Sequence, residues 1–491
     1  MKSRFKQLGK DSIIYGLGGM ISKGIGFLLL PIYTRIFNPA DYGTIEMLIV
    51  LNSFLGTLLV MGMDSAQSFY FFENKSQGIP SQAKMVTAIL QWKLTWGTII
   101  VIVATLLSPL LNHFFFNGHL SWEYFALAFA GSFFTQIMSQ SVEIYRLLYR
   151  PLGFISVTLG QTVLAATLAL ILIVGYDFGI LGFFWGSLIG AIIAALFGWW
   201  RVRIYLDLSQ WHIQWWPRLM KFGAPLLPAG FAMYVLNTSD RWFINHFNNQ
   251  EALGLYAVGA KFAMLISLAV VTFRQAWWPV AMDAIHSEDG PILFRTIGRL
   301  YLGCGSAAVV VISAFSPYLV RWFTVPAYFL AYPIIGVLSW SGIFLGFYLI
   351  VAGGIWRAER TAWAPLLMGT AALLNIGLNA WLVPVYGGIG AATATSISFC
   401  IWNVLTLIVS EKLWRVNYDY GIMMAQVGIG AIACILTLHF YSHASVPWYM
   451  WPINLLAIII LVILSFNRKH LNTILEYARF KKIQSIIKDH G

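Results

Sequence analysis

Short sequence features recur along the chain at a spacing of 210 residues. The pairs that share this spacing are residues 34–38 with residues 244–248, Arg150 with Arg360, and Tyr176 with Tyr386. The arginines close short basic loops, and the second tyrosine precedes a Gly-rich segment. Membrane proteins built from two similar halves usually bind their substrate where the halves meet. The repeat therefore favours a transporter.

The composition indicates an integral membrane protein. Of the 491 residues, 59% are hydrophobic and only 10% are charged, whereas soluble domains carry about 25% charged residues. Fourteen apolar stretches are each close to the ~20 residues that a helix needs to cross ~30 Å of hydrocarbon. They are residues 13–33, 44–63, 85–107, 124–141, 152–174, 181–200, 220–236, 253–273, 300–320, 332–352, 363–382, 390–409, 422–441 and 451–466. We therefore predict an all-α fold of about fourteen transmembrane helices.

The lysines and arginines predict how these helices are oriented. With the N-terminus in the cytoplasm, 25 of them fall on the cytoplasmic side, and the three on the opposite side are Arg35, Arg241 and Arg321. Such a bias is what the positive-inside rule describes. Both termini are therefore expected in the cytoplasm. The net charge of +12 then reflects membrane orientation and gives no reason to expect a nucleic-acid partner.

Six spans in each half make the two repeats parallel, related by an axis along the membrane normal. The predicted domains are a first six-helix lobe, an interfacial linker, a second six-helix lobe, two additional helices and a basic cytoplasmic tail. Their boundaries are 1–200, 201–219, 220–410, 411–466 and 467–491. The linker is rich in Trp and Arg, which suits the membrane surface.

Sequence signatures of catalysis are missing from the chain. It has no Walker-type phosphate loop, no H-E-x-x-H and no G-x-S-x-G, so neither ATP hydrolysis nor metalloprotease or hydrolase chemistry is expected. The nine histidines and three cysteines have no metal-ligand spacing. We therefore expect no enzymatic activity, no metal and no cofactor.

Charged residues inside the apolar stretches are the strongest functional candidates. Lys23 and Lys261 fall within predicted spans and have small neighbours on their own helix faces. A centred lysine costs about 2.5–3.5 kcal/mol on insertion scales, so it normally faces a protein interior or a water-filled cavity. The alternative is snorkelling or a buried pair with Glu46 or Asp64. Lys93, near the inner start of its span, is expected to snorkel.

Further charges lie at the ends of predicted spans. Arg241, at an outer end, could bind a phosphate through two parallel hydrogen bonds from its guanidinium group. Glu46, Asp64, Asp240 and Arg274 are candidates for a gate or for ion coupling, and a role as ordinary helix-end charges is equally open. The sequence does not choose between these roles.

Three segments resemble a known family. They are LPIYTRIFNPADYG at residues 30–43, NTSDRWFI at 237–244 followed by GLY at 254–256, and YGGIGAA at 386–392. These turns are similar to those of the polysaccharide flippases (Wzx-type) of the multidrug/oligosaccharidyl-lipid/polysaccharide exporter superfamily. The resemblance extends over essentially the whole chain and implies a MATE-like fold of two lobes.

The resemblance also implies a function. The substrate would be an undecaprenyl-diphosphate-linked oligosaccharide, moved from the cytoplasmic to the outer leaflet of a bacterial inner membrane by alternating access. Lys23, Arg241 and Lys261 would line a cationic cavity. The product would feed O-antigen, lipopolysaccharide or exopolysaccharide synthesis. Membrane lipids and other polysaccharide assembly proteins would be the partners, and the drive would be H⁺ or Na⁺ coupling or consumption of the product.

Alternative functions stay open at this point. A multidrug exporter of the same superfamily would favour buried carboxylates over buried lysines. A dedicated lipid II flippase would be expected to carry a dense run of arginines in the first span, which this chain lacks. A membrane polymerase or ligase would need a long outer loop with Arg or His, and none is present.

The predicted topology can be tested by cysteine labelling. Single cysteines at Lys75 and Arg357 should resist an impermeant thiol reagent in intact cells, because both positions are expected in the cytoplasm. A cysteine at Asn248 should react. Labelling of position 357 from outside would contradict the arrangement of six plus six spans.

Overall fold

The computed structural model describes residues 16, 18, 20, 21, 24–440 and 446–466 of the chain. Within these residues the regular secondary structure is helical, and no β-strand occurs. Helices are the expected solution for an apolar chain in hydrocarbon, because each helix satisfies its own backbone hydrogen bonds. The predicted basic tail, residues 467–491, lies outside the described residues, and the first predicted span lies partly outside them.

The chain divides into two compact units. The first comprises Met1–Ala257 and Ile376–Ala391, and the second comprises Val258–Asn375 and Ala392–Gly491. This division follows packing, whereas the domain boundaries given above follow the repeat, and those boundaries stay a prediction. Each unit is described below by itself.

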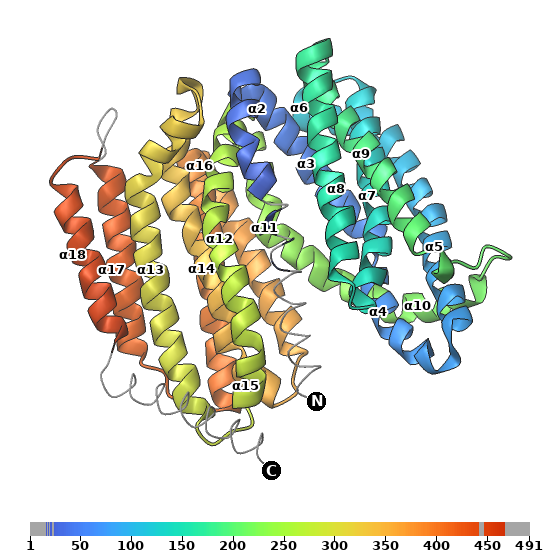
Figure 1. Ribbon diagram of the computed structural model, residues 1–491. Coiled ribbons are helices and arrows are strands. Elements are labelled where there is room, and N and C mark those ends of the chain that lie inside the picture. The colour runs from blue at the N-terminus through green and yellow to red at the C-terminus, as the bar shows by residue number, and fades with distance from the viewer. Residues whose placement is uncertain (1–15, 17, 19, 22–23, 441–445, 467–491) are drawn as a thin grey trace. The chain divides into compact units, whose positions relative to one another are not determined.

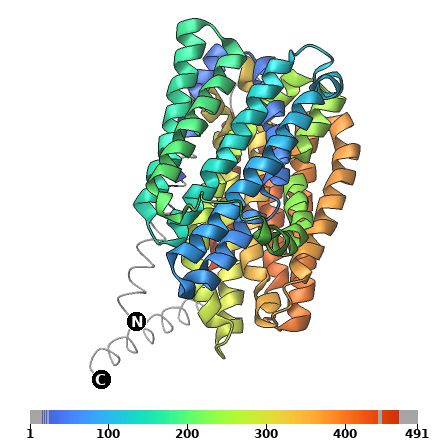
Figure 2. The same ribbon diagram turned by 90° about the vertical axis from the view of Figure 1, so that its right-hand side faces the viewer.

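The first unit contains most of the helices in the first half of the chain (Figure 1). They are α2 (Leu30–Ile36), α3 (Pro39–Val60), α4 (Met63–Glu73), α5 (Ile79–Leu106), α6 (Ser108–Phe116), α7 (Trp122–Leu147), α8 (Pro151–Leu170), α9 (Gly179–Arg201), α10 (Trp216–Gly223), α11 (Leu227–Phe247) and the first part of α12 (Gln250–Ala284). Helices α7, α8 and α9 pack side by side, and α3 packs against α7 and α11 (Figures 1 and 2).

The second unit is built around α13. Its helices are the rest of α12, α13 (Gly290–Phe323), α14 (Tyr332–Val351), α15 (Gly353–Arg357), parts of α16 (Trp363–Leu413), α17 (Tyr420–His439) and α18 (Met450–Ser465). Helix α13 packs against α14, α17 and α18. Small residues allow these close contacts: a Cβ at Gly305 of α13 would lie 2.8 Å from the side chain of Ile343 in α14.

The membrane-spanning character of the chain agrees with the predicted fold class. Ten helices of the described part are long and apolar enough to cross a membrane, and two shorter apolar helices are Gly24–Ile36 and Met450–Ser465. Helix α7 covers the predicted stretch 124–141 but is more polar, with residues such as Gln136 and Gln140, and is not among the ten. The all-α fold with membrane-spanning helices is confirmed, and the orientation of the termini stays a prediction.

Glycines with positive φ lie at two helix breaks, the first inside the predicted stretch 44–63 and the second between two predicted stretches. Gly62, with φ +72°, separates α3 from α4, and a Cβ there would lie 2.2 Å from the carbonyl oxygen of Gly223. Gly387, with φ 54° and ψ −132°, kinks α16 between the predicted stretches 363–382 and 390–409. Because glycine alone reaches positive φ at little cost, it sets both breaks.

The starts of α3 and α12 cross at an unusually short distance. A Cβ on Gly43 would lie 1.8 Å from the carbonyl oxygen of Gln250, and a Cβ on Gly254 would lie 1.8 Å from that of Pro39. Gly43 and Gly254 are 211 residues apart, and so are the residues that they contact, Pro39 and Gln250. The same spacing separates Asn38 and Asn249, whose side chains cap the two helices. The crossing therefore relates the two repeats, displaced by one residue from the spacing of 210.

This crossing should tolerate no side chain. We expect Gly254→Ala to destabilise the protein by about 1–3 kcal/mol, because the backbones must separate to admit the methyl group. The midpoint of thermal unfolding in detergent, followed by tryptophan fluorescence, measures the effect. Gly160→Ala in α8 is the control, since nothing lies within 4 Å of the added Cβ. Equal midpoints for the two variants would contradict the crossing.

Candidate functional site

A buried network of charges joins three helices of the first unit. Arg241 in α11 donates from Nε to Oε1 of Glu46 in α3 at 2.7 Å, and from Nη1 to Oδ1 of Asp240 at 3.0 Å. The side chains are 15%, 8% and 2% exposed in that order. The hydroxyl of Tyr256 in α12 donates to Oδ2 of Asp240. The network therefore ties α11 to both helices that cross at Gly43.

The network changes what Arg241 can do. Its guanidinium already bonds two carboxylates and lies 5.5 Å from the centre of the Tyr256 ring. A phosphate would have to displace Glu46 or Asp240 before it could form a bidentate contact with the guanidinium group. The role of Arg241 as a substrate ligand stays a prediction. The contacts are equally consistent with a gate that opens when the arginine exchanges its carboxylate partners.

A second buried ion pair corrects the prediction for Lys93. Its Nζ lies 2.8 Å from Oδ1 of Asp64, at the start of α4, and the lysine side chain is 2% exposed. It also donates to the backbone oxygen of Gln136 at 3.4 Å. The expectation that Lys93 snorkels is therefore wrong, because its charge is held inside the bundle by a carboxylate. Asp64, the predicted gate or coupling residue, is the partner.

The other predicted residues that the structure describes are not members of this network. Lys261 is half-buried in α12 and makes no hydrogen bond or ion pair with any residue that the structure describes. Arg274, further along α12, is exposed. Lys23 lies outside the described residues. The structure thus brings together Arg241, Glu46 and Asp240 and leaves Lys261 as a separate cation.

Sequence analysis missed one ion pair of the second unit. Arg299 in α13 lies 3.4 Å from Asp419, just before α17, and also donates to the backbone oxygen of Leu464. Gln426 donates to the backbone oxygen of Arg299 at 3.2 Å. These contacts hold α13 against α17 and α18. The partners are more than 100 residues apart in sequence, so no local sequence pattern predicts the pair.

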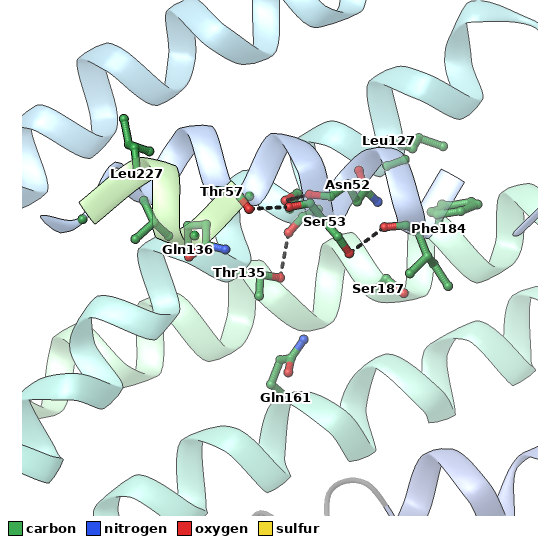
Figure 3. A pocket seen from close by; sticks show the side chains of 18 of the residues that line it. Asn52, Ser53, Thr57, Leu127, Thr135, Gln136, Gln161, Phe184, Ser187 and Leu227 are labelled. Carbon is green, nitrogen blue, oxygen red and sulfur yellow. Dashed lines mark hydrogen bonds between the residues drawn. The ribbon is translucent and has the colours of Figure 1, made fainter. Parts of the chain in front are cut away.

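Sequence analysis also missed a polar pocket within the first unit. The pocket has a volume of ≈ 680 Å³ and is lined by residues of α3, α4, α7, α8, α9 and α11 and of the adjoining turns (Figure 3). Asn52, Thr135, Gln136 and Gln161 are among the lining residues. Scattered amides and hydroxyls within apolar stretches were the available signal, but their convergence depends on how the helices pack.

The fold is similar to that of solved helical membrane proteins. It is similar to the lipid II flippase MurJ in an inward closed conformation, with a TM-score of 0.71 and 16% identity over 92% of this chain and 98% of that one. It is also similar to an inward-facing multidrug resistance MATE family transporter of the MOP superfamily, with a TM-score of 0.63 and 13% identity over 80% and 96% of the two chains. At these identities the likeness shows the fold.

Sequence comparison gives the family. A family described as "Polysaccharide biosynthesis protein" matches residues 8–284, more than half of the chain, and the chain belongs to this family. A relative from Haemophilus influenzae, "Lsg locus putative protein 1", is 22% identical over 286 residues, which cover 57% of this chain and 67% of the relative. The family predicted from the three sequence segments is therefore confirmed.

The Asp64–Lys93 pair generates a prediction about stability. Asp64→Asn leaves a buried lysine without its counter-charge, and breaking a buried pair costs about 3–5 kcal/mol. We expect a loss of stability near the lower end of this range, because the Asp64 side chain is 36% exposed. Adding Lys93→Met should restore most of the loss, as measured by thermal unfolding in detergent.

The exposed pair between Arg218 and Glu73 supplies the control. Its side chains are 51% and 43% exposed, so Glu73→Gln should change stability by less than about 1 kcal/mol. A double variant at Asp64 and Lys93 that folds but fails to transport would assign Asp64 a role beyond packing. Failure of Lys93→Met to rescue folding would contradict the pairing.

Proposed function

We propose that the protein translocates an undecaprenyl-diphosphate-linked oligosaccharide from the cytoplasmic to the outer leaflet of a bacterial inner membrane. The translocated unit would serve the synthesis of a surface polysaccharide. The observation that carries this proposal is membership of the polysaccharide biosynthesis family by a chain with the fold of membrane transporters. A carrier of this kind moves its substrate without making or breaking a covalent bond.

The physical problem is to carry a charged diphosphate across ~30 Å of hydrocarbon. Unassisted passage of a multiply charged group is prohibitive, because its hydration is lost. Lys261 is the candidate that meets this charge, since its ammonium group has no counter-charge among the described residues. Lys23 would assist it. Arg241 would join once its carboxylate partners are exchanged for phosphate oxygens.

Glu46 and Asp240 give the proposed transport cycle a gate. Both carboxylates hold Arg241 across α3, α11 and α12, so release of either would loosen the place where these helices meet. An arriving diphosphate competes with them for the guanidinium, and protonation of a carboxylate would weaken the same contacts. Coupling to H⁺ or Na⁺ would act through these groups or through Asp64.

Export of a different substrate is the second candidate. The similarity of fold to a lipid II flippase and to multidrug transporters favours it. A carrier of cationic drugs would need a carboxylate free to bind the drug. In the described residues Glu46 and Asp240 both bond Arg241, and Asp64 bonds Lys93. This pairing favours the anionic glycolipid.

Reconstitution tests the proposal directly. Purified protein in liposomes should move a lipid-linked oligosaccharide between leaflets without ATP, and an impermeant sugar-oxidising or sugar-binding reagent would report the newly exposed glycan. Lipid II and a cationic dye, offered in parallel, report the alternative substrates. Transport of the dye but not of the glycolipid would overturn the proposal, as would a strict requirement for ATP.

Substitutions of Lys261 test the cationic contact. Lys261→Ala should abolish transport while leaving insertion intact, because removing an intramembrane charge eases insertion. Lys261→Arg should retain part of the activity, since it keeps the charge with a different geometry. The control is Lys412→Ala, which removes an exposed lysine at the end of α16. Wild-type transport by Lys261→Ala would remove the lysine from the mechanism.

A further inference from the structure

We propose that the polar pocket of the first unit binds the uncharged sugars of the substrate, apart from the cations that meet its diphosphate. This inference rests on the proposed function and adds to it a second binding subsite. The pocket is open on one side and is lined by residues of α3, α4, α7, α8, α9 and α11. Its volume of ≈ 680 Å³ lies within the range of about 300–1,000 Å³ that is usual for small-molecule sites.

The chemistry of the lining is neutral and rich in hydrogen-bonding groups. Among the residues that the structure describes, twenty-one line the pocket, and none of these is Asp, Glu, Lys, Arg or His. Nine carry an amide or a hydroxyl group, and Phe183 and Phe184 add aromatic surface on one side. An amide both donates and accepts, as a sugar hydroxyl does. Aromatic rings suit the apolar faces of sugar rings.

Several of these groups have hydrogen-bonding capacity to spare. The Oδ1 atom of Asn52 is buried without a partner. The side chains of Gln136, Gln161 and Ser187 make no hydrogen bond with any residue in the described part of the chain. Figure 3 shows Gln161 extending from α8 towards the residues of α3 and α7. Buried polar groups are normally paired, so the unpaired Oδ1 atom of Asn52 favours a polar ligand. The half-buried side chains of Gln136, Gln161 and Ser187 are available to bind the same ligand.

Other hydroxyls in the pocket are already fixed by their own helices. Ser53 donates to the backbone oxygen of Ile49 at 2.9 Å, and Thr135 donates to that of Gly131 at 2.8 Å. Each such oxygen has used its proton and can still accept. The pocket therefore offers fixed acceptors beside amides that can donate. A ligand with many hydroxyl groups satisfies both kinds of group.

The shape of the pocket depends on small residues that face it. Gly56 lies between Asn52 and Val60 on α3, and a Cβ there would lie 3.2 Å from Nε2 of Gln136. Gly131 and Gly230 similarly leave space from α7 and α11. Larger residues at these positions would fill the pocket with side chains, as in an ordinary bundle core. The space is thus kept open beside groups that can bind a ligand.

Competing occupants fit the lining less well. A cationic drug needs a carboxylate, and a diphosphate needs lysine or arginine, but the described lining residues include neither. A polyprenyl chain would leave the amides of Gln136 and Gln161 unpaired in an apolar environment, which is costly. Sugars remain, and a neutral site avoids both the desolvation cost of a buried charge and repulsion of the diphosphate.

Two ligands can separate the sugar subsite from the cationic one. One probe is the free oligosaccharide released by mild acid from the lipid-linked intermediates of the bacterium that makes this protein. The other is undecaprenyl diphosphate without sugar. Binding of each to the purified protein in nanodiscs is measured by titration calorimetry. We expect Gln161→Leu and Gln136→Leu to weaken binding of the oligosaccharide about tenfold each, as loss of a well-made hydrogen bond implies.

The same variants should bind undecaprenyl diphosphate as the wild type does. Lys261→Ala should show the reverse pattern. Ser187→Ala removes only one oxygen atom and replaces a leucine variant that fails to fold. Gln214→Leu, at an exposed position, is the control. Wild-type affinity for the oligosaccharide in Gln161→Leu, Gln136→Leu and Ser187→Ala would overturn the sugar subsite.

Transport assays distinguish this failure from failure of the proposed function. If the wild-type protein moves the lipid-linked oligosaccharide and the pocket variants move and bind it equally well, only the sugar subsite is wrong. If the wild-type protein moves no lipid-linked oligosaccharide, the proposed function itself is wrong. If the pocket variants lose both oligosaccharide binding and transport while keeping their thermal unfolding midpoints, the subsite is supported.

Discussion

The free energy required to place a charge or an unpaired polar group in hydrocarbon governs the whole structure. It forces the backbone into helices, which satisfy their own hydrogen bonds. It also forces side-chain charges into pairs: Asp64 with Lys93, and Arg241 with Glu46 and Asp240. A polar group that escapes this rule is therefore informative, because a function is the usual reason for keeping it.

Two kinds of exception occur in the described residues, and they suit the two chemical parts of a lipid-linked glycan. Lys261 is a cation of α12 that has no counter-charge among the described residues, and it is suited to a phosphate. The described lining of the pocket beside Gln136 and Gln161 combines apolar surface with uncharged amides and hydroxyls, and it is suited to sugars. Such a division would let the protein hold the charged and uncharged parts through separate groups. It would also allow the sugar preference to change without altering the contact to the diphosphate.

Close helix packing positions these groups. Gly43 and Gly254 let the backbones of α3 and α12 come into direct contact where the helices cross. The network of Arg241 forms beside that crossing. Gly62 ends α3 with positive φ and so shapes one end of the polar pocket. A membrane transporter that alternates between states needs rigid contacts and breaks of this kind, since hinge and shear motions concentrate where helices end or slide.

The sequence by itself determined the membrane class, the apolar stretches, the repeat and the break near Gly387, because hydropathy, charge bias and glycine spacing are properties of short segments. It also singled out Arg241, Glu46 and Asp240, without showing that they form one network. Only the tertiary structure decided that Lys93 is paired rather than snorkelling, and that Asn52, Gln136 and Gln161 converge on one pocket. These outcomes depend on which helix faces meet, and the energy of a buried polar group is set by neighbours far away in the chain.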